Sequence, residues 1–341
     1  MTAAEVSKRL AEYYHIMYRD GSGLTVSGVE EISQGWETEL YSFTVEYDGG
    51  NRRIMEDRVI RIYPGRGAAR KAEKEYTVMS RLREAGYPVP EVFHIDVEGE
   101  ALGRPFIIME RIVGRSMMED FVLGSKEGLE GALALMIGLL VKLHRIEVKW
   151  VFPETNIGST AEYIDSRLDW ARGEVEENCV QWIYPVIQWL EERKAGVSPE
   201  RLSVVHRDFQ PMNIMLGEDG SPAVIDWGAA GVGDYRDDLA WSVLLASTFW
   251  DPSLRMIILG EYESISGRKV RDFEFFKMLV ILKRLTDVSV SLTRGAEEMG
   301  MRAGAEEMMR ESKQHLIKVH DLLKERTGLR LPEFEELLSK L

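Results

Sequence analysis

Apolar and polar positions alternate with a period of two over much of the first third of the chain, and this period predicts β-strands. An amphipathic helix over residues 1–18 precedes them. Residues 68–85 carry apolar side chains at helical spacing and end before Gly86 and Pro88. The order of these elements predicts a five-stranded antiparallel sheet with one main helix. The expected strands are residues 28–35, 39–50, 57–64, 91–100 and 105–112.

From residue 113 onward, apolar residues recur with the longer period that predicts helices. Residues 128–146 and 273–292 are strongly apolar, so we expect both to lie in the core of a second, mostly helical lobe. We therefore predict an α+β, bilobal chain, with a small nucleotide-binding lobe at residues 1–112 and a larger catalytic and substrate-binding lobe at residues 113–341. A junction of this kind is a common place for a ligand cleft.

A short polar segment lies between two apolar runs in the sequence VVHRDFQPMNIML, residues 204–216. It places Asp208 close to Asn213, and the next strand-like run ends in Asp226. Phosphoryl transfer from a nucleotide needs a base for the acceptor hydroxyl and oxygen ligands for Mg²⁺. Asp208 is the candidate base, and Asn213 and Asp226 are the candidate ligands of Mg²⁺. A base of this kind typically contributes about 10²–10⁴ in rate.

The segments HRDFQPMN (206–213) and IDWG (225–228) resemble the His-Arg-Asp…Asn and Asp-Phe-Gly motifs of the protein-kinase-like superfamily. The segments VIRIYP, FIIMERIVG and LVKLHRI add to this likeness. Over most of its length the chain is more closely similar to the aminoglycoside phosphotransferase and choline kinase family. The resemblance implies a bilobal protein-kinase-like fold that binds ATP or GTP with Mg²⁺ between its lobes.

The resemblance also implies roles for residues outside the two motifs. Arg61 stands where the family has a basic residue that contacts the nucleotide phosphates, and Glu75 is its expected partner. His206 and Asp238 are expected to support the catalytic loop, and Gly35 lies in the loop expected to cover the phosphates. The hinge that receives the base corresponds to four consecutive residues, Met109, Glu110, Arg111 and Ile112.

Two of these positions depart from the family pattern, and a second interpretation stays open for each. Arg61 replaces the expected lysine. Its planar fork can hold two phosphate oxygens, but it is also compatible with a surface arginine on an edge strand. The loop SQGWET, residues 33–38, has the single glycine Gly35 instead of three. It either covers the phosphates or is an ordinary hairpin turn.

Charge and composition narrow the classes of partner. The net charge of −14, from 43 basic and 57 acidic residues without a Lys/Arg block, disfavours nucleic-acid binding. The apolar runs are far shorter than the ~20 residues that span a bilayer, so we expect no membrane association. Cys179 is the only cysteine, which excludes an internal disulfide and fits a cytoplasmic location.

The spacing of the motifs and the side chains of residues 151–180 bear on the class of acceptor. Only a short segment separates Asp226 from Asp238, which leaves little room for the peptide platform of a protein kinase and favours a small-molecule acceptor. The acidic residues 151–180 predict either a wall for a cationic acceptor, such as an aminoglycoside, choline or an amino alcohol, or a solvated helix face. A sugar is a further candidate. Five tryptophans form either a cation cage or core: Trp170, Trp182, Trp189, Trp241 and Trp250.

Two other functions remain open at this point. One is a catalytically idle nucleotide-binding module with a regulatory role, and the other is a kinase that acts on protein side chains. The intact set of Asp208, Asn213 and Asp226 favours an enzyme over the idle module. The sequence defines neither the oligomeric state nor the choice between ATP and GTP.

Overall fold

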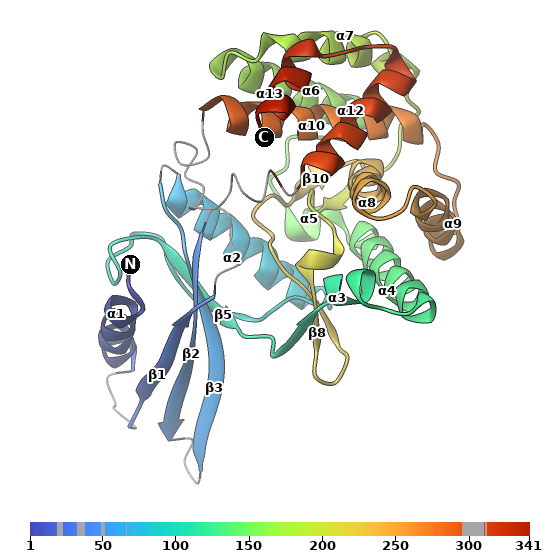
Figure 1. The fold of residues 1–341 in the computed structure, drawn as a ribbon. Coiled ribbons are helices and arrows are strands. Elements are labelled where there is room, and N and C mark those ends of the chain that lie inside the picture. Colours follow the sequence, from blue (N-terminus) through green and yellow to red (C-terminus); the bar gives the residue numbers. More distant parts are fainter. Residues whose placement is uncertain (19–22, 33–37, 49–51, 66, 295–309, 311) are drawn as a thin grey trace. The chain divides into compact units, whose positions relative to one another are not determined.

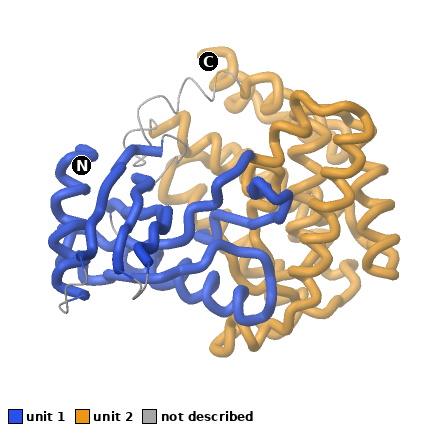
Figure 2. The backbone as a smooth tube through the Cα atoms, turned by 90° about the horizontal axis from the view of Figure 1, so that it is seen from below, with its two compact units in different colours: residues 1–115, 215–228 blue, residues 116–214, 229–341 orange. Residues whose placement is uncertain are grey.

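A computed structural model of the chain describes residues 1–18, 23–32, 38–48, 52–65, 67–294, 310 and 312–341 (Figure 1). The backbone divides into two compact units, shown in different colours in Figure 2. The first unit is Met1–Arg115 with Met215–Gly228, and the second is Ser116–Ile214 with Ala229–Leu341. The predicted domain division between residues 112 and 113 stays a prediction. The segment Met215–Gly228 groups with the first unit although it lies after that boundary.

The first unit holds a five-stranded antiparallel sheet of order β1–β2–β3–β5–β4, which confirms the sheet predicted from the alternation. The central strand β3 pairs with β2 and β5, and in this register Arg61 lies opposite Leu40 and Ile107. The elements are α1 (Ala3–Met17), β1 (Thr25–Glu31), β2 (Glu39–Asp48), β3 (Arg53–Ile62), α2 (Ala68–Glu84), β4 (Val92–Asp96), β5 (Phe106–Glu110) and β9 (Pro222–Val224).

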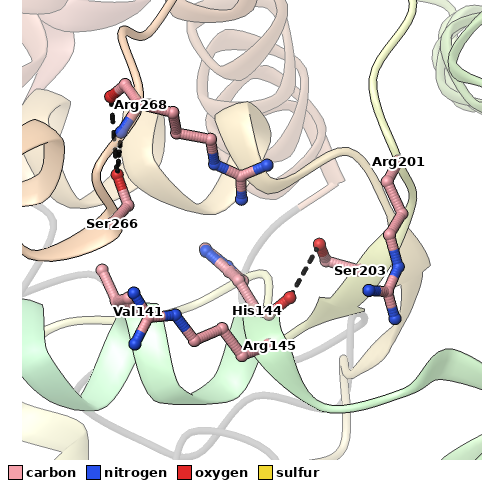
Figure 3. Close-up of a pocket in the computed structure, with 7 residues that line it drawn as sticks. All are labelled: Val141, His144, Arg145, Arg201, Ser203, Ser266 and Arg268. Carbon is pink, nitrogen blue, oxygen red and sulfur yellow. Dashed lines mark hydrogen bonds between the residues drawn. The ribbon is translucent and has the colours of Figure 1, made fainter.

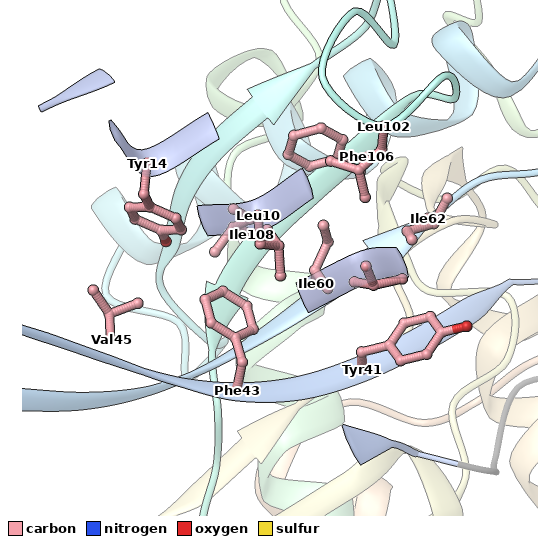
Figure 4. Packing of buried hydrophobic residues seen from close by; sticks show 11 residues of the cluster. Leu10, Tyr14, Tyr41, Phe43, Val45, Ile60, Ile62, Leu102, Phe106 and Ile108 are labelled. Atoms are coloured by element: carbon pink, nitrogen blue, oxygen red, sulfur yellow. The ribbon is translucent and has the colours of Figure 1, made fainter. Parts of the chain in front are cut away.

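One face of this sheet is covered by helix α1, whose first turn is fixed by a capping box between Thr2 and Glu5. The buried side chains of α1 recur four residues apart and therefore lie on one face of the helix. Figure 4 shows how they meet alternate residues of the strands. The buried cluster is Val6, Leu10, Tyr14, Tyr41, Phe43, Val45, Ile60, Ile62, Leu102, Phe106 and Ile108.

The second unit is mostly helical, as the sequence predicts. Helices α8 and α10 are buried on nearly all sides, which explains why their sequences show no clear polar face. A two-stranded sheet, β10–β7, leads into the segment that contains Asp208. The main elements are α3 (Met118–Val122), α4 (Lys126–Arg145), α5 (Val148–Val151), α6 (Thr160–Glu177), α7 (Tyr184–Glu191), β7 (Ser203–Val205), β10 (Gly231–Gly233), α8 (Tyr235–Phe249), α9 (Leu254–Ser266), α10 (Phe273–Arg294), α12 (Lys313–Thr327) and α13 (Pro332–Lys340).

A third sheet, of order β6–β8–β9, contains the strands β6 (Gly114–Ser116) and β8 (Ile214–Gly217). Both strands lie where the chain passes from one unit to the other. Across the described residues, the structure contains no helix with the length and apolar character that a membrane crossing needs.

Candidate active site

Asp208 lies in the second unit, in the loop that follows strand β7. One of its carboxylate oxygens, Oδ1, accepts hydrogen bonds from Gln210 Nε2 and Trp241 Nε1, each at 2.8 Å. The other, Oδ2, accepts from Asn213 Nδ2 at 2.9 Å. These three neutral donors fix the direction of the carboxylate. Asp208 is therefore oriented as a proton acceptor should be.

His206 and Asp238, the predicted supports of this loop, both form hydrogen bonds within it, and their supporting role stays a prediction. The carboxylate of Asp238, which is fully buried, accepts hydrogen bonds from the backbone amides of His206 at 2.7 Å and Arg207 at 2.6 Å. Arg207 has a φ of 67°, a strained conformation for a residue with a side chain, and Asp238 holds the backbone there. Nδ1 of the His206 ring accepts a hydrogen bond from the backbone amide of Asp208 at 3.2 Å.

His144, on helix α4, also holds Asp238. Its Nε2 lies 3.3 Å from Asp238 Oδ2, and its Nδ1 lies 2.9 Å from the hydroxyl of Tyr262. Burial alone would raise the pKa of Asp238, but the hydrogen bond and charge of His144, followed by the charge and backbone amide of His206, lower it below its ordinary value. Asp238 is therefore charged, and it holds the backbone of the loop that contains Asp208.

Trp241 contacts Asp208, and the sequence did not assign it to this loop. It follows Asp238 by three positions on helix α8, so the two side chains lie on the same side of the helix. Ser242 adds a hydrogen bond from its Oγ to the Phe209 carbonyl at 2.7 Å. In the sequence, the spacing of three positions between Asp238 and Trp241 could have identified Trp241, because it places both residues on the face of α8 that meets the loop.

A second group of predicted residues lies in the first unit and is centred on Arg61. Its Nη1 donates to Glu75 Oε1 at 2.7 Å and its Nη2 to Asp226 Oδ1 at 2.8 Å. Its Nε donates to Thr38 Oγ1 at 3.1 Å, and Tyr63 donates its hydroxyl to Glu75 Oε2 at 2.6 Å. Arg61 is thus no free surface arginine, and the predicted pair with Glu75 is present in the structure.

Burial and charge act in opposite directions on this group. Burial alone would lower the pKa of Arg61, but the carboxylates of Glu75 and Asp226 raise it above its ordinary range. Burial, followed by the charge of Glu75, raises the pKa of Tyr63 well above its ordinary value. Tyr63 therefore keeps its proton and remains a donor to Glu75.

Asp226 and Asn213, the predicted Mg²⁺ ligands, each present an oxygen that suits a hard cation. Asp226 lies two residues after β9 with a φ of 66°, and 44% of its side chain is exposed. Asn213 uses Nδ2 for hydrogen bonds to the Asp208 carbonyl and carboxylate, so its predicted role as a ligand would fall to Oδ1. A carboxylate and an amide oxygen fit Mg²⁺, which keeps several of its waters. Asn213 belongs to the second unit and Asp226 to the first.

The four predicted hinge residues lie at the end of β5 and just beyond it. The amide of Glu110 donates to the Glu91 carbonyl at 2.7 Å, and the amide of Arg111 to the Asp57 carbonyl at 3.3 Å. Met109 pairs with β3 and β4. Ile112 is the one of these four residues that neither pairs in the sheet nor donates its amide in the hydrogen bonds above. Their role as a hinge stays a prediction, and Gly35 lies outside the described residues.

Arg284, on helix α10, lies near Asp208 in the second unit and was not identified from the sequence. Burial lowers its pKa below the ordinary range, while the charges of Asp287 and Asp208 oppose this shift. Its Nε is 3.1 Å from His315 Nε2, and His315 Nδ1 is 2.7 Å from Thr248 Oγ1. Within the described part of the chain, no carboxylate forms a salt bridge with this guanidinium. Arg284 is therefore a largely enclosed cation held by a neutral histidine.

The protonation of His315 gives a prediction for pH. Burial, followed by Arg284 and Lys318, lowers the pKa of His315 to about 3. Below about pH 6.5 the unfolded chain takes up a proton at this position that the folded chain does not. We therefore expect the free energy of unfolding to fall as the pH drops from about 6.5 towards 3, by up to about 1.4 kcal/mol per pH unit from this group.

Urea unfolding of the wild type and of His315→Gln from about pH 7 to about pH 4 measures this contribution. Glutamine still offers an acceptor to Arg284 but does not titrate, so the stability difference between the two proteins should change with pH. A constant difference over the whole range would show that His315 is not held in its neutral form.

The chain is similar to one family of known proteins over most of its length. The model of the family described as the Phosphotransferase enzyme family matches residues 28–273. Among curated proteins, acyl-CoA dehydrogenase family member 10 of Mus musculus is 27% identical over 199 residues, which are 57% of this chain and 18% of that protein. The matched part of the chain therefore spans less than a fifth of that relative's length.

Solved structures show the same fold at low identity. A thermostable mutant of aminoglycoside phosphotransferase APH(4)-Ia, in a ternary complex with AMP-PNP and hygromycin B, has a TM-score of 0.60 and 16% identity, covering 94% of this chain and 99% of that one. Choline kinase LicA from Streptococcus pneumoniae has a TM-score of 0.59 and 17% identity, covering 97% and 100%. Both similarities support the predicted protein-kinase-like fold.

Proposed function

The chain belongs to the phosphotransferase enzyme family, and from this premise we propose that it transfers the terminal phosphoryl group of ATP or GTP to a hydroxyl group of a small molecule. The observation that carries the proposal is the orientation of Asp208 by Gln210, Asn213 and Trp241. A binding module has no need of an oriented base. The nucleotide analogue bound by the APH(4)-Ia neighbour supports a nucleotide donor.

In the proposed reaction, Asp208 accepts the proton of the acceptor hydroxyl as that oxygen bonds to the terminal phosphorus. The bond between this phosphorus and the bridging oxygen breaks, and the electron pair leaves with the nucleoside diphosphate. Arg61, held by Glu75, contacts the phosphates. Asn213 Oδ1 and the Asp226 carboxylate would each offer an oxygen to Mg²⁺, and the bound ion would neutralise charge on the phosphates. Most of the catalysis in such reactions comes from positioning and charge stabilisation.

A direct test is Mg²⁺-dependent transfer from ATP, and separately from GTP, to a pooled library of hydroxylated small molecules, read by mass. A product that is heavier by one phosphoryl group would establish the reaction and name the acceptor. Transfer to generic protein substrates instead would favour the kinase that acts on side chains. Nucleotide binding without any product from an acceptor-rich library would favour the idle module.

The structure weakens the case for a cationic acceptor at the places the sequence suggested. The acids of helix α6 mostly bond to nearby groups of the protein; for example, Asp165 pairs with Lys194 at 2.7 Å. Arg193 lies 4.2 Å from the ring centre of Trp189, and Lys283 lies 4.4 Å from that of Trp241. These two aromatic faces are already occupied by cations of the protein. An aminoglycoside, choline, an amino alcohol or a sugar remains a candidate acceptor through the family.

Arg284 favours a second class of acceptor, an alcohol that also carries a carboxylate or another anion. An enclosed cation without a carboxylate partner is costly, and an anionic ligand would offset that cost. Its guanidinium uses one of five N–H groups in the bond to His315, so a bidentate contact with an anion remains available. Asp208 also lies close enough to Arg284 for its negative charge to raise the pKa of the guanidinium.

We expect Arg284→Gln to raise the acceptor KM by about tenfold or more, because the lost contact is charge-assisted. The KM for ATP should stay within about twofold. Steady-state kinetics with one pool of hydroxy acids and one of amino alcohols measures both effects. Arg294→Gln, an exposed arginine on the same helix, is the matched control. An unchanged acceptor KM, or a product from the amino alcohols alone, would rule out this second class.

A further inference from the structure

A pocket of about 240 Å³ lies in the second unit and does not include Asp208. Its walls come from three parts of the chain, namely the end of helix α4, the segment that leads into β7, and the turn after helix α9 (Figure 3). The volume is smaller than the roughly 300–1,000 Å³ of sites for drug-sized ligands, so only a small molecule fits. The lining residues are Val141, His144, Arg145, Arg201, Ser203, Ser266 and Arg268.

Each of the three parts contributes one arginine, and no carboxylate lines the pocket. Two of the arginines are held in place. Arg145 Nη2 donates to the Ile265 carbonyl at 2.8 Å, and the Arg268 guanidinium lies 4.2 Å from the ring centre of Tyr235. Figure 3 shows Arg268 opposite His144, with Arg201 beside Ser203. Three like charges around one small pocket repel each other, and an anion would relieve that repulsion.

Few acidic groups compensate these charges. Glu200 lies 3.9 Å from Arg268 Nη1, at the outer limit of an ion pair, and also 3.4 Å from Arg271 Nη2. In the described residues, neither Arg145 nor Arg201 forms an ion pair. The pocket therefore keeps a positive potential in a chain whose net charge is −14. This positive local potential, opposite in sign to the net charge of the protein, points to an anionic ligand.

The floor of the pocket is polar and buried. Ser203 and His144 are 2% and 4% exposed, and Ser203 Oγ donates to the His144 carbonyl at 3.2 Å. Ser266 adds a hydroxyl at the rim, near the backbone of Arg268. A planar guanidinium group can donate two parallel hydrogen bonds to the oxygens of one phosphate. Three guanidinium groups at a polar floor suit a phosphate group better than an apolar molecule.

We propose that this pocket is a second ligand site, which binds the phosphate group of a small phosphorylated metabolite. The proposal does not depend on the proposed function. The pocket is connected to the loop of Asp208 through side chains. His144 lines the pocket and also contacts Asp238, which holds the backbone of that loop. The site is therefore separated from that loop by two side chains.

Calorimetric titration of the whole protein tests the proposal, with inorganic phosphate and glycerol 3-phosphate as probes and without nucleotide or Mg²⁺. A salt concentration of about 0.15 M screens weak attraction to exposed charges. The double variant Arg145→Gln, Arg201→Gln removes two cations from exposed positions, so the fold should persist. Arg193→Gln, an exposed arginine of the same unit outside the pocket, is the control.

We expect saturable binding of at least one probe by the wild type and by Arg193→Gln, and a loss of about tenfold or more in the double variant. Stronger binding of glycerol 3-phosphate than of phosphate would identify a phosphorylated metabolite as the occupant, and the reverse order would identify free phosphate. Absence of saturable binding in the wild type would overturn the proposal. Equal binding by the double variant would also overturn it, because the phosphate would then bind elsewhere, for example at Arg61.

Discussion

Replacement of Asp208 by alanine is expected to lower turnover by about 10²–10⁴-fold, the usual contribution of a general base. Nucleotide affinity should change little, because the residues proposed to hold the phosphates centre on Arg61 in the other unit. Single-turnover transfer measures the chemical step, and calorimetric titration with ATP measures binding. The combination of lost turnover and retained binding would establish Asp208 as the base.

The alanine variant also removes the acceptor of Trp241 Nε1, a donor on a side chain that is 6% exposed. An unpaired buried donor costs about 1–3 kcal/mol, so a loss of folding could imitate a loss of catalysis. Asp208→Asn separates the two, since it keeps an oxygen for Trp241 but is no base. Glu130→Ala, on an exposed position of helix α4, is the control. Turnover that survives in the asparagine variant would mean that another group accepts the proton.

Local sequence patterns account for the backbone that carries these residues. Alternation predicts strand β3 and so places Arg61 in the centre of the sheet, and helical spacing predicts α2 and so places Glu75. The polar segment between two apolar runs predicts the loop of Asp208 and Asn213. These features depend on residues that are close in sequence, where periodicity and turn chemistry are informative.

The features that the sequence did not reveal are contacts between side chains of distant elements. One hydrogen bond joins Trp241 on helix α8 to Asp208 in the loop after β7. In the sequence, Trp241 cannot be distinguished from a tryptophan that only packs in the core. His315 lies on the buried face of α12 and looks like an ordinary core histidine until Arg284 is placed beside it. Periodicity states which face of a helix is buried, but it does not state which residue of another helix that face meets.

Replacement of Glu75 by glutamine is expected to lower the free energy of unfolding by about 1.5–3 kcal/mol, the usual value of a hydrogen bond to a charged group. Glu75 is 1% exposed, and the substitution removes the buried counter-ion of Arg61 while it keeps an oxygen for Tyr63. Arg61 would then pair with Asp226 alone. The KM for MgATP should rise by about tenfold, because Arg61 would be less well held for the phosphates.

Thermal unfolding and steady-state kinetics on the same preparations measure the two effects. The matched control is Glu73→Gln, an exposed position two residues earlier on α2, which changes the net charge equally. Full recovery of stability at saturating ATP would mean that the nucleotide phosphates replace Glu75 as the counter-ion of Arg61. An unchanged KM together with reduced stability would assign the Arg61–Glu75 pair to folding alone, and the phosphate contact would then have to come from another residue of the first unit.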